Sequence, residues 1–109
     1  MAQPQNSSGI TTGDLVPAAV MPAVLTKAPL VFEDGATQFF RSDGSTVYDD
    51  HGQSEEGTWS VVEDGKYTSF WPPNYHSTYA ITWIVEGSEI VGLTFVEVDK
   101  GDRYVGRYQ

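Results

Sequence analysis

The 109-residue chain contains no cysteine. A disulfide framework, a thiolate nucleophile and a cysteine-based zinc site are therefore excluded. The chain also lacks the run of about 20 apolar residues that a membrane-spanning helix requires. Basic residues are scarce, because six Lys and Arg stand against 15 Asp and Glu, for a formal net charge of −9. Such a surface repels phosphate, so we expect neither nucleic acid nor a membrane as a partner.

Motifs that would identify a reaction are missing as well. The sequence has no nucleophile elbow, no phosphate-binding glycine loop, no His-Glu-x-x-His motif and no dinucleotide-binding fingerprint. Because it also has only two histidines and no convincing Ser-His-acid arrangement, hydrolysis has little support. We expect no cofactor. The polar start of the chain leaves an exported and a cytoplasmic location equally open.

Regularly spaced turn signals indicate the fold. Asp-Gly or Glu-Gly pairs stand at 34–35, 43–44, 56–57, 64–65 and 86–87, with short β-prone runs between them. Glycine accepts a positive φ without a Cβ clash and Asp can bond its own backbone, so such pairs favour hairpin turns. The spacing predicts one all-β domain, an antiparallel meander of about eight strands that closes into a small barrel.

The strands are predicted from runs of β-prone and alternating residues after position 30. Alternation is clearest at 79–85 and 91–95, and the second run is apolar on both faces, as a central strand would be. The predicted strands are Leu30–Glu33, Thr37–Arg41, Thr46–Asp49, Thr58–Val62, Tyr67–Trp71, Thr78–Val85, Ile90–Val98 and Arg103–Tyr108.

The residues before the strands divide into two parts. Residues 1–12 are expected to be a flexible polar lead, and 13–109 the barrel domain. Asp14 can cap a short helix and Pro17 is tolerated in its first turn. Pro22 lacks an N–H, which limits the helix to about two turns. We interpret this apolar segment as a plug over one end of the barrel, with a homodimer contact as the alternative.

Two short motifs stand in the middle and at the end of the chain. They are Gly57-Thr58-Trp59, followed by a strand, an Asp-Gly turn and another strand, and the terminal Gly106-Arg107-Tyr108. Together they resemble motifs of the lipocalin-like (calycin) barrels. More narrowly, the run from Leu30 through Phe70-Trp71-Pro72-Pro73 is similar to short bacterial lipocalin-like proteins of unassigned function. The similarity covers roughly residues 25–109 and implies a barrel, while it implies no particular activity.

The segment from Tyr48 to Glu56 is the densest cluster of titratable groups. Asp49, His51 and Glu55 are the residue types that bind a divalent metal, and His51 next to a carboxylate is a candidate base. Neighbouring strand residues point to opposite faces, however, so three ligands from one loop need a defined geometry. We therefore favour a solvated hairpin loop and expect no metal site.

A second cluster, Phe70-Trp71-Pro72-Pro73-Asn74-Tyr75-His76, connects two predicted strands. The prolines cannot donate to a strand ladder, so the strand must end there, which places Trp71, Tyr75 and His76 near a barrel mouth. Aromatic side chains with polar tips suit a small ring-containing ligand. The alternative is that they cap the core. Pro-Pro-Asn-Tyr also matches a pattern that proline-recognition domains bind.

Arginines form the third candidate group. An Arg107 pointing into the barrel could bind a carboxylate of Glu33, Glu97 or a ligand, and Arg41 and Arg103 are further candidates. An outward Arg107 that balances the acidic surface is the alternative reading.

Three functional hypotheses follow. The first is a barrel that binds a small, partly apolar or aromatic molecule, with its ligand site among Trp59, Trp71, Tyr75, His76, Tyr79, Trp83 and Tyr104. The second is a cofactor-free lyase, isomerase or cyclase in which Tyr48, His76 and Arg107 transfer protons and bind a carboxylate. The third is a solid barrel that acts as a structural or interaction module. A cavity inside the barrel would distinguish the first two from the third.

Overall fold

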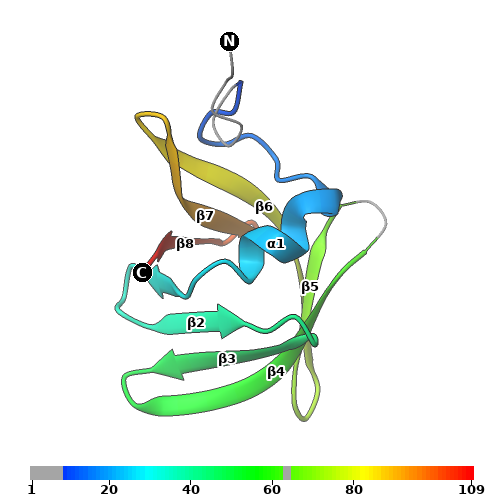
Figure 1. Ribbon diagram of the computed structural model, residues 1–109. Coiled ribbons are helices and arrows are strands. Elements are labelled where there is room, and N and C mark those ends of the chain that lie inside the picture. The colour runs from blue at the N-terminus through cyan, green and yellow to red at the C-terminus, as the bar shows by residue number, and fades with distance from the viewer. Residues whose placement is uncertain (1–8, 63–64) are drawn as a thin grey trace.

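The computed structural model describes residues 9–62 and 65–109, and within them the chain is an all-β barrel. Antiparallel strands follow one another in chain order and close between the first and the last, as predicted (Figure 1). They are β1 (Leu30–Phe32), β2 (Thr37–Phe40), β3 (Ser45–Asp50), β4 (Gln53–Val61), β5 (Tyr67–Trp71), β6 (Tyr75–Glu86), β7 (Glu89–Glu97) and β8 (Arg103–Tyr108).

The hairpin between β3 and β4 is tighter than predicted. His51 and Gly52 form a two-residue turn with φ of 54° and 92°, and Asp50 pairs with Gln53 across it. Positive φ at both central residues matches the twist of the flanking strands. The segment predicted as a solvated loop is therefore mostly strand, and β4 begins at Gln53 rather than at Thr58. Most residues at its start are exposed, so no alternation of apolar and polar residues revealed the strand.

The N-terminal segment completes one side of the barrel. The 12-residue β6 pairs with β5 only from Tyr75 to Tyr79, which leaves part of its edge without that neighbour. Gly13 N donates to Trp83 O at 3.0 Å, and Val16 N donates to Ile81 O at 2.9 Å. These bonds satisfy backbone groups that an open strand edge would expose. Residues 1–8 of the predicted flexible lead lie outside the described residues.

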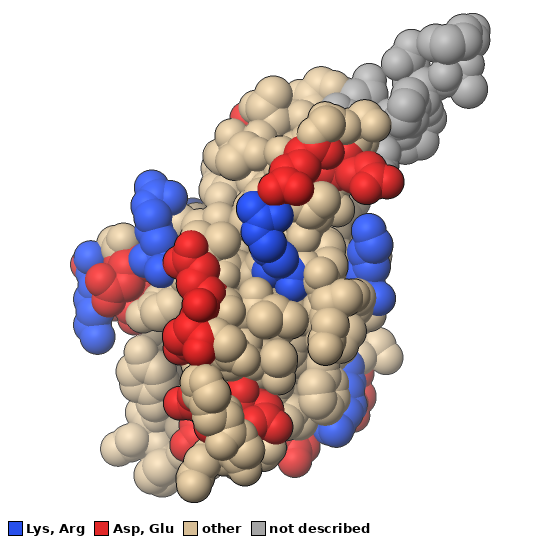
Figure 2. All heavy atoms as spheres, turned by 90° about the vertical axis from the view of Figure 1, so that its left-hand side faces the viewer, with Lys and Arg blue, Asp and Glu red and all other residues tan. Residues whose placement is uncertain are grey.

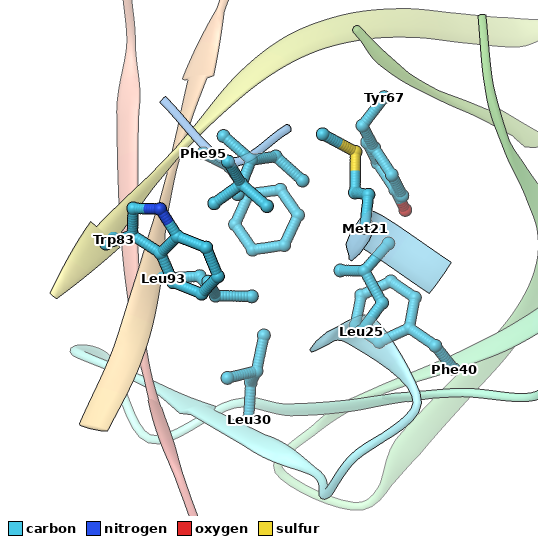
Figure 3. Packing of buried hydrophobic residues seen from close by; sticks show 10 residues of the cluster. Met21, Leu25, Leu30, Phe40, Tyr67, Trp83, Leu93 and Phe95 are labelled. Atoms are coloured by element: carbon cyan, nitrogen blue, oxygen red, sulfur yellow. The ribbon is translucent and has the colours of Figure 1, made fainter. Parts of the chain in front are cut away.

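A short helical segment covers one end of the barrel, as the sequence predicted (Figure 1). It consists of the 3-10 turn η1 (Ala18–Val20) and the helix α1 (Met21–Leu25). Met21 and Leu25 are four positions apart, so they lie on the same helical face. Both are fully buried and point into the barrel core (Figure 3).

The core lies beneath this helix. The side chains that meet Met21 and Leu25 there come from strands on several sides of the barrel (Figure 3). They include Leu30, Phe40, Tyr67, Ile81, Trp83, Leu93 and Phe95. Burial of this cluster supplies the main stabilising term of so small a domain. The helix end of the barrel is thus filled by side chains.

The surface carries charges of both signs. On the face shown in Figure 2, acidic and basic side chains are interspersed. Mixed charges of this kind favour solubility. Among the helices of residues 9–62 and 65–109, none reaches the length and apolar character of a membrane span.

Candidate functional site

A cavity of about 560 Å³ occupies the barrel beyond the core cluster. It is bordered by the turns that follow β1 and β5 and by the start of β8, whereas no residue of α1 lines it. Tyr67 and Phe95 line the cavity and belong to the core cluster, so they form its floor. Half of the sixteen lining residues are aromatic: Phe32, Tyr48, Tyr67, Trp71, Tyr75, Tyr79, Phe95 and Tyr104.

The aromatic rings of the cavity support one another. Tyr48 meets Trp71 edge to face with ring centroids 6.3 Å apart, and Tyr79 meets both Phe95 and Tyr104 at 6.1 Å. Edge-to-face pairs at these separations are attractive beyond the burial of their area. The walls of the cavity are therefore held in place before any ligand binds.

Gly57 leaves space for the Trp71 ring to pack directly on the backbone of β4. A Cβ at this position would lie 2.7 Å from a Trp71 ring carbon and 2.6 Å from the Phe70 carbonyl oxygen. The pair Glu56-Gly57 was predicted as a turn, and this is wrong, since Gly57 lies inside β4. Glycine is required here for a close approach between strands rather than for a positive φ.

The floor of the cavity contains buried polar side chains. Gln38 Nε2 donates to Thr46 Oγ1 at 2.9 Å, and Gln38 is only 8% exposed. Ser69 is only 5% exposed, and its hydroxyl has no hydrogen-bond partner among the described residues. An unsatisfied buried hydroxyl is costly, and such groups are uncommon in folded proteins.

The rim of the cavity is acidic. Glu33, Asp34 and Glu55 line it together with one cation, Arg103. Burial raises the pKa of the Tyr48 hydroxyl above its ordinary value, and the carboxylates of Asp34, Asp50 and Glu55 raise it further. The rim therefore carries an excess of negative charge next to an aromatic ring.

A further carboxylate lies close to the tyrosines of the cavity. Glu97 is 6% exposed, and its Oε2 accepts a 2.7 Å hydrogen bond from Ser77 Oγ. Burial raises the pKa of both Tyr79 and Tyr104, and the nearby Glu97 carboxylate contributes in each case. Among the described residues no basic side chain forms an ion pair with Glu97.

Part of the predicted ligand site is assembled in the cavity. Trp71, Tyr75, Tyr79 and Tyr104 all line it, and so does Tyr48, which was predicted as a catalytic candidate. Tyr75 and Tyr104 are nearly half exposed, as residues at a mouth would be.

Other predicted site residues lie elsewhere. Trp83 is buried in the core below the helix, and Trp59 Nε1 donates to the carbonyl oxygens of Arg41 and Ser45 at 3.1 Å. Neither Trp83 nor Trp59 lines the cavity. The sequence pattern predicts that both side chains point into the barrel, but it does not predict which end of the barrel the helix fills.

His76 and Arg107 lie outside the barrel. The strand β6 begins at Tyr75 rather than at Thr78, so Tyr75 points inward and its neighbour His76 points outward. His76 packs there on Phe70, with ring centroids 4.5 Å apart. Arg107 Nη1 contacts Glu86 Oε2 at 2.7 Å on the surface. The predicted catalytic group of Tyr48, His76 and Arg107 is therefore not assembled in one place.

The cluster around His51 is a hairpin whose polar groups bond one another. His51 Nδ1 lies 2.7 Å from Asp50 Oδ1, and this contact raises the pKa of the imidazole. Asp49 Oδ1 accepts from Gly52 N at 2.9 Å, which stabilises the turn. Within the described part of the chain, no three His, Asp or Glu side chains converge as metal ligands.

Most residues of the cavity floor were not predicted from the sequence, and the rim residues Glu33, Glu55 and Arg103 were predicted for other roles. Phe32, Gln38, Tyr67, Ser69 and Phe95 line its floor and walls but were not among the predicted site residues, and Asp34 at the rim was predicted only as part of a turn. Ser69 could have been found from alternation, since it lies two residues before Trp71 on the same strand face. The acidic rim depends on which turns meet at one barrel end, and that follows from the order of the strands.

Comparison with known proteins gives no relative. The chain matches no protein-family model, no curated protein and no solved structure.

Proposed function

We propose that this protein is a lipocalin-like barrel that binds a small, partly apolar or aromatic molecule in the cavity opposite α1. The observation that carries the proposal is the cavity itself, about 560 Å³ in volume and lined in half of its positions by aromatic side chains. Ligand pockets are typically about 300–1,000 Å³, mostly apolar, with a few polar groups that orient the ligand.

The orphan hydroxyl of Ser69 supports the same proposal. Ser69 lines the floor of the cavity and is 5% exposed, and its hydroxyl has no partner among the described residues. A bound molecule with a polar atom would satisfy it and recover the cost of its burial. An apolar cavity that only reflected loose packing would have no need of a hydroxyl at this position.

Ligand binding to the folded state raises the melting temperature, and this gives the test. We expect 2-phenylethanol and indole to stabilise the protein in a concentration-dependent and saturable way. Tyr75→Ala and Tyr104→Ala should weaken this stabilisation, because both rings line the cavity.

Phe39→Ala is the matched control for these variants. Phe39 is 38% exposed and points outward from β2, so its loss leaves the cavity intact. The proposal fails if no aromatic probe stabilises the protein, or if the control weakens binding as much as the two cavity variants.

A further inference from the structure

We infer that the ligand of this cavity is an organic cation, in which an ammonium or quaternary ammonium group is attached to an apolar or aromatic body. The inference rests on the proposed function, because it assigns a chemical class to the ligand of the same cavity. Three observations support it: the charges of the rim, the ring faces of the wall and the buried hydroxyl of Ser69.

The charges at the cavity favour a positive ligand. Glu33, Asp34 and Glu55 line it against the single guanidinium of Arg103. Glu97 adds a carboxylate close to Tyr79 and Tyr104. A cation in the cavity is attracted by this excess, and the attraction is larger there than in open water because apolar walls lower the local dielectric.

The aromatic side chains supply a second attraction. Tyr48, Trp71, Tyr75 and Tyr104 line the cavity together with the carboxylates of the rim. The face of an aromatic ring attracts a cation through its quadrupole, and several rings around one ammonium form the usual recognition site for such ligands. Carboxylates and aromatic rings therefore act on the same group.

Ser69 is independent of the rim. Ser69 lines the same cavity as the aromatic rings, and its buried hydroxyl lacks a partner among the described residues. A hydroxyl can accept a hydrogen bond from an ammonium N–H or bond another polar atom of the ligand. The site is thus polar inside as well as acidic at its rim.

Three probes with the same ring test the class of ligand: 2-phenylethylamine, 2-phenylethanol and phenylacetate, which are a cation, a neutral molecule and an anion at neutral pH. Affinities are measured by calorimetric titration at low salt. We expect the amine to bind at least about tenfold more tightly than the alcohol, and phenylacetate to bind most weakly. Added salt should lower the affinity for the amine more than the affinity for the alcohol, because it screens the rim charges.

Glu55→Gln links any such preference to the rim. Glu55 is exposed, so this change leaves the core intact. We expect this substitution to lower the affinity for the amine by about three- to tenfold and to change the affinity for the alcohol by less than about twofold. Glu89→Gln is the matched control, since it removes an exposed carboxylate from the start of β7, outside the cavity lining.

The outcomes separate the two proposals. If the alcohol or phenylacetate binds as tightly as the amine, the cavity binds ligands but the assignment to cations is overturned. If none of the three probes binds, the proposed function fails together with this inference. A preference for the amine that is unchanged by Glu55→Gln and by Glu33→Gln would also overturn the inference, because the rim would not be its source.

Discussion

Two serines that face each other across β5 and β6 provide a sensitive test of the cavity. Ser69 pairs with Ser77 in the ladder, and both are buried, with 5% and 7% exposure. Ser77 Oγ donates to Glu97 Oε2 at 2.7 Å, whereas the Ser69 hydroxyl has no partner among the described residues. Replacing each by Ala removes the same atom from nearly the same depth of the barrel. Only the hydrogen bonding differs.

The free energy of unfolding should therefore change in opposite directions. Ser77→Ala removes a hydrogen bond to a charged group, which is worth about 1.5–3 kcal/mol, and leaves a buried carboxylate without its donor. Ser69→Ala removes an unsatisfied hydroxyl and should change stability by between about zero and 1 kcal/mol in the favourable direction.

Urea denaturation of the ligand-free protein, followed by far-UV circular dichroism, measures both changes. A difference of about 2 kcal/mol between the variants moves the midpoint by about 1 M urea. If Ser69→Ala destabilises the protein as much as Ser77→Ala does, the prediction is wrong, because the Ser69 hydroxyl must then be satisfied in the folded state.

Other changes test the plug, the wall and the buried tyrosines. Leu25→Ala removes a fully buried side chain of α1, so a thermal melt should show a loss of about 2–5 kcal/mol in the free energy of unfolding. A loss below about 1 kcal/mol would show that the plug does not fill the core. Gly57→Ala brings a Cβ within 2.7 Å of the Trp71 ring, so it should lower the free energy of unfolding by about 1–3 kcal/mol and alter the near-UV circular dichroism. An unchanged near-UV spectrum would contradict this prediction. Burial raises the pKa of Tyr108 from 10.0 to about 12, so the unfolded state loses this proton at a lower pH than the folded state does. The free energy of unfolding should therefore be highest below pH 10 and fall as the pH rises toward 12. Tyr108→Phe should make that decline shallower, and an equally steep decline in the variant would contradict the assignment.

Local chemistry explains why the fold could be predicted. The turns at Asp34-Gly35 and Asp43-Gly44 have glycine at φ near +90°, as the dipeptides indicate. In the apolar segment ending at Leu25, Pro22 fits the first turn of α1, and the four-residue spacing of Met21 and Leu25 places both on the face that plugs the barrel. Each of these features is specified within a few residues, so the strand number and the plug follow from the sequence.

The site depends on strand register and on which end is filled, and neither is local. A difference of three residues in the start of β6 places Tyr75 in the cavity and His76 outside it. One residue of register moves every side chain to the other face of a strand. Trp83 points inward as expected, yet it lies at the end that α1 fills. The mouth and its acidic rim therefore became visible only in the closed barrel.

The three tryptophans allow the most direct test of ligand binding in the cavity. Trp71 lines it, Trp59 lies beside its floor against Tyr67, and Trp83 lies in the core below α1. In an NMR titration with 2-phenylethylamine, each indole N–H gives its own signal. We predict a saturable shift of the Trp71 signal, a smaller change for Trp59 and none for Trp83. A Trp71 signal that does not respond to any of the phenyl probes, or a response centred on Trp83, would contradict the account.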